Sequence, residues 1–137
     1  MIGIVIVAHG GLAREFLATA EHVVGPQPAV ETVAIQPDDN RSEKRELICD
    51  AADRVDRGAG VIVVTDMFGG SPSNLALPAC RGHNRRILYG ANMPMLIKLM
   101  KSRHKPMGEA VRLSLEAGRK YIDSAIIGEE RLCGWSA

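Results

Sequence analysis

The fold of this chain is decided by its N-terminal stretch, Ile2-Gly3-Ile4-Val5-Ile6-Val7-Ala8-His9-Gly10-Gly11. The apolar, β-branched run over residues 2–8 predicts a strand buried on both faces, a pattern typical of parallel sheets covered by helices. The run ends in a histidine and two glycines, and a helical pattern follows immediately. Ligands of open α/β sheets bind beyond the carboxyl ends of the strands, so His9 is expected at the functional edge.

The composition is that of an ordinary globular protein with one domain. The chain has 137 residues, 46% hydrophobic and 24% charged, and its 17 basic and 16 acidic residues give a formal net charge of +1. This balance argues against a nucleic-acid partner, because phosphate binding usually requires a basic excess. No apolar segment approaches the ~20 residues of a membrane span, and the N-terminal run is a poor signal peptide. Three widely separated cysteines without CxxC spacing predict free thiols, no metal ion and a cytoplasmic location.

Further strand patterns follow the first one at regular intervals. Residues 30–35, 60–65 and 85–90 predict three more strands, and residues 124–127 predict a short terminal strand. Strands that alternate with helices predict an α/β fold, an open, doubly wound, mainly parallel four-stranded sheet with helices on both faces. The expected organisation is a single domain over residues 1–128 and a polar tail over residues 129–137, which contains Trp135.

The helical segments carry their own start and stop signals. A first helix runs from Leu12 to Gly25-Pro26, and a second is expected to be capped by Asn40 or Ser42 and to fray at Arg57-Gly58. A third has Ser71 as its expected N-cap and Pro72 in its first position, and Pro78 predicts that it is short or kinked. The loop Asn92-Met93-Pro94 opens a fourth helix, and a last helix has its apolar face over residues 110–117.

A carboxylate, Asp66, follows the strand at residues 60–65. Alone it is most simply a helix cap. If the first and third strands are neighbours, however, Asp66 touches His9, because parallel strands end at the same edge of the sheet. A carboxylate that accepts the Nδ1–H bond would leave Nε2 unprotonated and nucleophilic. The other histidines, at positions 22, 83 and 104, have no recognisable partner and are interpreted as structural or surface groups.

A glycine-rich loop, Gly69-Gly70-Ser71-Pro72-Ser73-Asn74, follows Asp66 closely. Exposed backbone N–H groups and a helix N-terminus together favour anion binding. A glycine-rich turn with an N-cap explains the same residues without a ligand. In combination with His9 and Asp66, the loop would complete a set of nucleophile, orienting carboxylate and phosphate cradle.

Three stretches of this chain resemble a known family. They are residues 4–10 (Ile-Val-Ile-Val-Ala-His-Gly), residues 66–74 (Asp-Met-Phe-Gly-Gly-Ser-Pro-Ser-Asn) and residues 90–96 (Gly-Ala-Asn-Met-Pro-Met-Leu). Their order and separation are similar, over about the first 120 residues, to the enzyme IIA component of the mannose (mannose-fructose-sorbose) family of the bacterial phosphoenolpyruvate-dependent sugar phosphotransferase system. The middle motif is the long and specific one.

The resemblance implies a phosphotransferase that works through a phosphohistidine. His9 would accept a phosphoryl group from the histidine phosphocarrier protein and pass it to enzyme IIB, with Asp66 as the orienting partner. Ser71 would contact the phosphoryl group, assisted by the backbone amides of Gly69 and Gly70. No cofactor and no metal are implied, and the membrane components IIC and IID would be involved only indirectly, for sugar uptake or regulation.

The same resemblance implies a site wall and a dimer. The wall is formed by Met67, Phe68, Asn92 and Pro94, although the turn at residues 92–95 is also explained as a strand-to-helix turn covered by core methionines. Members of the family form homodimers that exchange a terminal strand, for which residues 124–127 are the matching segment. The alternative is a strand that pairs within its own chain.

Two other functions compete with this one. A small tetrapyrrole metal chelatase can carry a histidine-glycine pair after its first strand, which would give His9 a role with metal. A receiver-like signalling domain would be phosphorylated on Asp66, but it needs acidic metal ligands where this chain has Ala8-His9-Gly10. The basic residues Lys98, Lys101, Arg103 and Lys105 are expected on the solvated side of a helix and its loop, and a docking face is the alternative.

Overall fold

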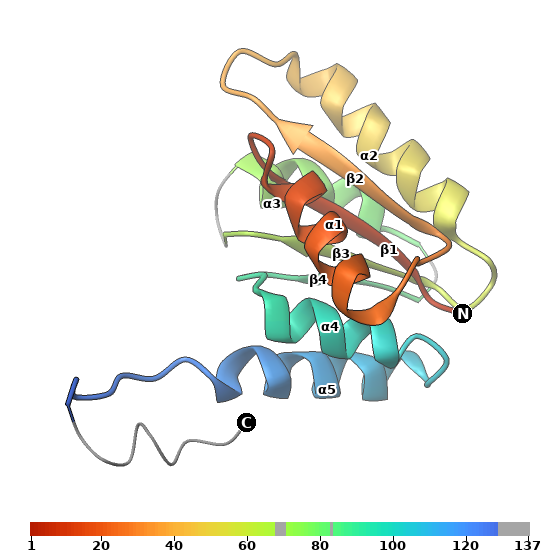
Figure 1. Cartoon of the computed structure of the whole chain (residues 1–137). Coiled ribbons are helices and arrows are strands. Elements are labelled where there is room, and N and C mark those ends of the chain that lie inside the picture. The colour runs from red at the N-terminus through yellow and green to blue at the C-terminus, as the bar shows by residue number, and fades with distance from the viewer. Residues whose placement is uncertain (68–70, 83, 129–137) are drawn as a thin grey trace.

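Four parallel strands form the centre of the computed structural model, which describes residues 1–67, 71–82 and 84–128 (Figure 1). The strands are β1 (Gly3–His9), β2 (Val30–Ile35), β3 (Val61–Thr65) and β4 (Arg85–Leu88), in the order β2-β1-β3-β4. All three pairings are parallel. The predicted doubly wound sheet is therefore confirmed, and β1 lies between β2 and β3, so β1 and β3 are neighbours as the site prediction requires. Strand β4 is two residues shorter than the sequence predicts, and β3 is one residue shorter.

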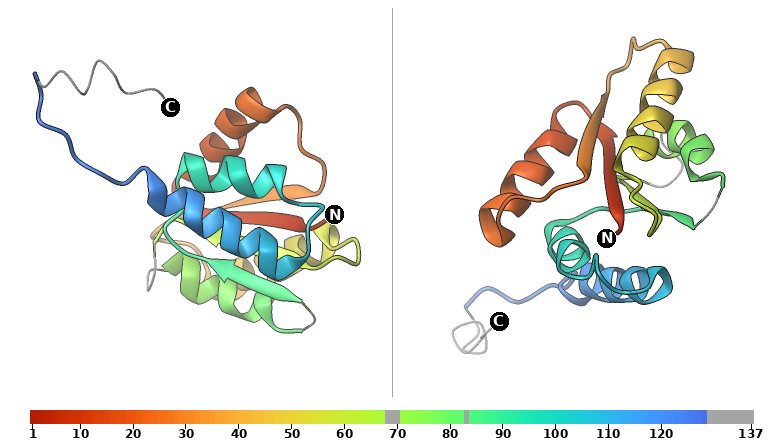
Figure 2. Two further views of the ribbon diagram at one scale, coloured as in Figure 1. Left: turned by 90° about the horizontal axis from the view of Figure 1, so that it is seen from below. Right: turned by 90° about the vertical axis from the view of Figure 1, so that its right-hand side faces the viewer.

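Two helical layers cover the faces of this sheet (Figures 1 and 2). The helices are α1 (Leu12–Val24), α2 (Arg41–Val55), α3 (Ser71–Ala76), a 3-10 helix η1 (Leu77–Cys80), α4 (Met93–Lys101) and α5 (Met107–Lys120). Helices α1, α4 and α5 share one core with one face of the sheet, and α2, α3 and η1 share another core with the opposite face.

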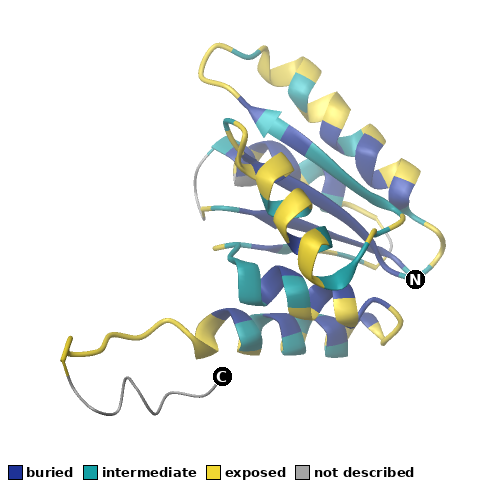
Figure 3. Cartoon of the chain, in the orientation of Figure 1, coloured by how far each residue is buried: buried dark blue, intermediate teal, exposed yellow. Residues whose placement is uncertain are grey.

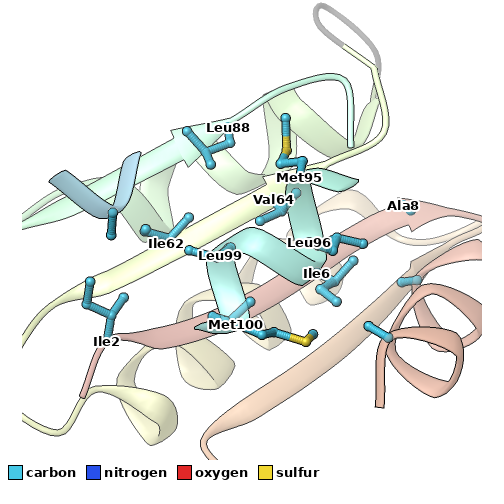
Figure 4. Packing of buried hydrophobic residues seen from close by; sticks show 14 of the residues in the cluster. Ile2, Ile6, Ala8, Ile62, Val64, Leu88, Met95, Leu96, Leu99 and Met100 are labelled. Carbon is cyan, nitrogen blue, oxygen red and sulfur yellow. The ribbon is translucent and has the colours of Figure 1, made fainter. Parts of the chain in front are cut away.

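The alternation of side chains in β1 divides the core between these layers. Ile4 and Ile6 belong to the core on the α4 side, whereas Val5 and Val7 belong to the core on the α2 side. All four are fully buried, as the colouring of the central strands in Figure 3 shows. Figure 4 shows α4 lying across β1, β3 and β4, with Leu96 and Leu99 among the side chains that it places on the sheet. A continuous apolar strand is thus explained by burial on both faces.

The helix ends follow the predicted signals with one small shift. Asn40, rather than Ser42, caps α2, since its side chain accepts a hydrogen bond from the backbone N–H of Glu43 at 3.0 Å. Pro78 accompanies the change from α3 to the 3-10 helix, so the predicted short helix is confirmed. Ser71 is the first residue of α3 and not the residue before it, a difference of the size usual at helix ends.

One prediction for the second half of the chain is wrong, and another is not observed within a single chain. Residues 124–127 form no strand that pairs within their own chain, and residues 121–128 are exposed as they lead away from α5 (Figure 1). Arg103 is not on the solvated side of its helix: it is 1% exposed and donates hydrogen bonds at 2.9 Å to the carbonyls of Ile2 and Ala29. Burial lowers the pKa of Arg103 to about 10. This guanidinium joins the loop after α4 to the start of the sheet.

The described residues contain no helix with the length and apolar character that crossing a membrane requires. The polar tail predicted at residues 129–137 lies outside them.

Candidate active site

The carboxyl ends of β1 and β3 bring His9 and Asp66 together. Val7 of β1 and Thr65 of β3 are paired across the two strands. His9 comes soon after Val7, and Asp66 comes directly after Thr65. His9 Nδ1 lies 2.9 Å from Asp66 Oδ2, and the backbone N–H of His9 donates to the same oxygen at 3.2 Å. The predicted contact is confirmed, and the carboxylate holds both the ring and the backbone of His9.

This contact determines which nitrogen of His9 is available. An ionised carboxylate only accepts hydrogen bonds, so the bond to Asp66 requires the proton on Nδ1. The other ring nitrogen, Nε2, then carries the lone pair. The His9 side chain is 49% exposed and that of Asp66 is 10% exposed, so the ring can be reached from solvent while its partner is covered. The arrangement presents a nucleophilic nitrogen on a fixed ring.

Gly10 shapes the entry from β1 into α1. Its φ is +57°, in the left-handed region that glycine adopts without strain, and its backbone N–H donates to the carbonyl of Ile35 at 2.9 Å. The chain therefore turns directly after His9 while the end of β1 stays bonded to β2. This turn keeps the histidine at the rim of the sheet.

The predicted phosphate cradle is described only in part. Phe68, Gly69 and Gly70 lie outside the described residues. Ser71 is half-buried at the start of α3, which contacts both β1 and β3. Asp66 and Ser71 thus lie at opposite ends of one short connection from β3 to α3.

The predicted wall residues have different surroundings. Met67 is exposed next to Asp66. Asn92 accepts a hydrogen bond from the backbone N–H of Met95 at 3.0 Å and donates to the carbonyl of Gly118 at 2.8 Å, so its side chain caps α4 and joins it to α5. Pro94, in the first turn of α4, lines a groove between these two helices.

The loop before α4 nevertheless adjoins the site edge. The backbone N–H of Ala91 donates to the carbonyl of Thr65 at 3.0 Å, which holds the start of this loop against the end of β3. The sequence left open that residues 92–95 are only a strand-to-helix turn covered by core methionines. The observed contacts of Asn92 fit this alternative, because its bonding partner Met95 is buried and belongs to the core on the α4 side.

One polar residue at the site was not singled out from the sequence. Thr65 is fully buried at the end of β3, and among the described residues neither its Oγ1 nor Asp66 Oδ1 has a hydrogen-bond partner. A hydroxyl in the otherwise apolar run Val61-Ile62-Val63-Val64-Thr65 was the available signal. One of these two buried atoms thus belongs to the carboxylate that holds His9, and the other belongs to the residue before it.

The fold and the site together define a class of protein in which a histidine at the edge of a parallel sheet is held by a carboxylate. Within the described ranges, no group of three or more His, Cys, Asp or Glu side chains is arranged to hold a metal ion. What the geometry offers is a nucleophilic imidazole with a stabilising anion behind it.

Comparison with known proteins specifies the class. The family model described as PTS system fructose IIA component matches residues 3–115. The mannose-specific EIIAB component of the phosphotransferase system of Escherichia coli (strain K12) is 32% identical over 125 residues, which are 88% of this chain and 38% of that protein. The chain therefore spans well under half the length of the curated relatives that it matches first.

Solved structures agree with this match. The PTS IIA protein associated with the fucose utilization operon of Streptococcus pneumoniae superimposes with a TM-score of 0.76 and 31% identity, covering 88% of this chain and 91% of that one. The mannose/sorbose-specific IIA subunit of Enterococcus faecalis has a TM-score of 0.82 at 22% identity, covering 93% and 97%, and supports the fold.

The chain belongs to the mannose family of IIA components of the sugar phosphotransferase system. IIA components of this system are phosphotransferases that pass a phosphoryl group through a histidine. The comparisons give no support to the tetrapyrrole chelatase or to the receiver domain.

Proposed function

We propose that His9 is the residue that carries the phosphoryl group, and that Nε2 is the atom to which it is bonded. The observation that supports this most strongly is the 2.9 Å contact between His9 Nδ1 and Asp66 Oδ2, because it leaves the lone pair on Nε2. The half-exposed ring is also accessible to another protein. Of the other histidines, His22 and His104 lie in the described part of the chain, and there neither forms a hydrogen bond or ion pair with a carboxylate.

The reaction is a transfer between two imidazoles. The Nε2 lone pair of His9 attacks the phosphorus of a phosphohistidine on the donor, a new P–N bond forms, and the donor's P–N bond breaks as its electron pair returns to the donor nitrogen. Such a transition state is loose, so catalysis depends on positioning and on charge stabilisation. Asp66 holds the ring in line and stabilises the positive charge that develops on it as Nε2 is phosphorylated.

Ser71 is proposed to contact the transferred group. It begins α3, which contacts both strands that carry the site. In the family that this chain resembles, a serine at this position and the backbone amides of the two preceding glycines contact the phosphoryl oxygens, which corresponds to Ser71, Gly70 and Gly69. Met67, Phe68, Asn92 and Pro94 are proposed as the surrounding wall.

The donor and the acceptor are assigned from the family. We infer that His9 accepts its phosphoryl group from the histidine phosphocarrier protein and donates it to enzyme IIB, with the membrane components IIC and IID involved only indirectly. We therefore propose a cytoplasmic location, which agrees with the free thiols of Cys49 and Cys80. Residues 1–128 are proposed as the IIA domain, and the family model covers most of this range.

A homodimer with exchanged terminal strands is proposed for the same reason. Ile122, Ile126 and Ile127 are 75%, 64% and 94% exposed, which is unusual for a run of large apolar side chains. Strand β4 is at the edge of the sheet, and among the described residues it pairs only with β3. Pairing of residues 124–127 with β4 of a second copy would cover both features. Deletion from Ser124 onward should then give a monomer by light scattering, and an unchanged dimer would contradict the exchange.

The phosphocarrier function is tested by reconstitution. Incubation with phosphoenolpyruvate, enzyme I and the histidine phosphocarrier protein should add one acid-labile phosphoryl group, measured by intact mass at neutral pH. His9→Ala should remain unlabelled, whereas His22→Ala, an exposed histidine on α1, should be labelled like the wild type. Equal labelling of His9→Ala, or no labelling of the wild type, would reject the proposal.

A further inference from the structure

A groove of about 480 Å³ runs between α4 and α5. Met93, Pro94 and Ile97 of α4 and Leu113 and Ala117 of α5 form an apolar floor, and all of them are only half-buried. The buried core residues of α4 are Met95, Leu96, Leu99 and Met100, and of the floor residues of α4 only Met93 also packs against that core, so most of the floor is left over after the core has formed. An apolar groove of this size in a protein of 137 residues is a candidate docking surface.

The rim of this groove is positively charged. Lys98, Lys101 and Lys120 all line it and all are exposed. The acidic residue of the groove, Glu116, is bonded to Arg112 at 2.9 Å. In the part of the chain that the structure describes, neither Lys98 nor Lys101 takes part in an ion pair. A segment that fits the groove should therefore combine large apolar side chains with acidic ones.

The chain itself contains such a segment. Residues 129–137, which lie outside the described residues, read Glu-Glu-Arg-Leu-Cys-Gly-Trp-Ser-Ala. Leu132 and Trp135 supply large apolar side chains, and Glu129 and Glu130 outnumber the single cation Arg131. Nine residues span up to roughly 30 Å when extended, whereas a helix with the length of α4 is roughly 14 Å long. The segment is long enough to follow the whole groove.

The path of the preceding residues indicates which groove the segment meets. Residues 121–128 lead away from the body of their own chain (Figures 1 and 2), and the backbone N–H of Ile122 donates to the carbonyl of Arg119 in α5 at 3.3 Å. If residues 124–127 pair with β4 of a second copy, the following residues are delivered to that copy. In a two-fold dimer the delivery is reciprocal.

We propose that residues 129–137 of each subunit dock in the α4–α5 groove of the other, with Trp135 and Leu132 on the apolar floor and Glu129 and Glu130 near the lysine rim. This inference rests on the exchanged dimer of the proposed function. It assigns a partner to a groove that shares Pro94 with the proposed wall of the His9 site, and it gives the tail a role in holding the dimer.

Trp135 is the only tryptophan of the chain, so its fluorescence reports the tail directly. In the full-length wild type we expect a blue-shifted emission and acrylamide quenching severalfold weaker than in the free peptide 129–137. The double variant Lys98→Glu/Lys101→Glu should lower the ratio of docked to undocked tail by about fivefold, the effect of two exposed ion pairs. The matched control Arg41→Glu/Arg45→Glu changes the charge equally on α2, at the opposite face of the sheet, and should leave the quenching unchanged.

A mixed dimer then identifies the chain that supplies the groove. The variant Ile97→Glu keeps Trp135 but has a damaged groove floor, so its tryptophan fluorescence should be strongly quenched by acrylamide when it is alone. An excess of Trp135→Phe, which has an intact groove, should restore the protection of Trp135 in the mixed dimer. Docking between subunits would be overturned if Trp135 stayed as quenched in the mixed dimer as in Ile97→Glu alone, or if Trp135 were already protected from acrylamide in Ile97→Glu alone.

A wild-type dimer whose Trp135 is quenched like the free peptide would reject the docking while leaving the dimer and the phosphocarrier function intact. A wild type that is a monomer by light scattering would reject the docking together with the exchange.

Discussion

Replacement of Asp66 by asparagine tests how the structure activates His9. The substitution keeps the shape of the side chain but removes its charge, and it allows an amide N–H to donate to Nδ1. In that orientation the ring proton moves to Nε2 and the lone pair needed for attack is lost. Asp66 Oδ2 accepts two bonds from His9, at 2.9 Å from Nδ1 and 3.2 Å from the backbone N–H, so in that orientation the backbone N–H of His9 also loses its acceptor.

The magnitude follows from the bond that is weakened. A hydrogen bond to a charged group contributes about 1.5–3 kcal/mol, and at about 1.4 kcal/mol per tenfold this corresponds to a loss of roughly 10- to 150-fold in the transfer rate. The partial exposure of His9 favours the lower part of that range, because solvent screens the charge.

A rapid-quench measurement of single-turnover transfer from the phosphorylated phosphocarrier protein gives this rate. Asp50→Asn, an exposed aspartate on α2, is the matched control and should transfer at the wild-type rate. Histidine NMR with ¹⁵N labelling should show Nε2 unprotonated in the wild type and a shift toward the other tautomer in Asp66→Asn. A wild-type rate in Asp66→Asn would refute the reasoning.

Four further predictions concern stability and reactivity. Arg103→Met should cost about 3 kcal/mol in urea unfolding, since it leaves two carbonyls without their buried donor, and an Arg103→Met variant as stable as the wild type would contradict this. Thr65→Val should stabilise the protein by about 1 kcal/mol, because the buried Oγ1 has no partner among the described residues; a loss of stability would mean that the hydroxyl is bonded. Gly60→Ala should destabilise it by more than about 2 kcal/mol, since its φ is +92° and a Cβ would clash with the Asn84 carbonyl; a near-neutral change by thermal melting would disprove the clash. Burial raises the pKa of Cys80 to about 11, so alkylation at pH 8, followed by peptide mass, should be about 100-fold slower than for a thiol at the ordinary 9.0, and rapid labelling would contradict this.

The sheet was predictable because its strands carry strong local patterns. The run over residues 2–8 is apolar at every position except Gly3, and burial on both faces is the arrangement that suits such a run. The predicted edge strand extended two residues too far, over Tyr89 and Gly90, whereas β4 ends at Leu88. These two residues continue the apolar pattern only weakly, and the end of a strand is set by its pairing partner.

The contact between His9 and Asp66 was predictable from topology alone. Both follow buried strands, and neighbouring parallel strands end at one edge of the sheet. Arg103 was misjudged, because a cation near other lysines ordinarily indicates solvent, and only the three-dimensional path brings the carbonyls of Ile2 and Ala29 to its guanidinium. Residues 124–127 form no strand within their own chain because they meet no pairing partner there, so their strand prediction depends on a second copy.

The central claim is that a phosphoryl group is bonded to Nε2 of His9, and the atom can be identified directly. The protein, labelled with ¹⁵N on histidine, is phosphorylated by the reconstituted donor chain and examined by ³¹P and ¹H–¹⁵N NMR at neutral pH. The account predicts one phosphohistidine, with the P–N bond at Nε2 of His9 and Nδ1 still protonated against Asp66. A phosphoryl group on Nδ1, on another histidine, or on the carboxylate of Asp66 would contradict it.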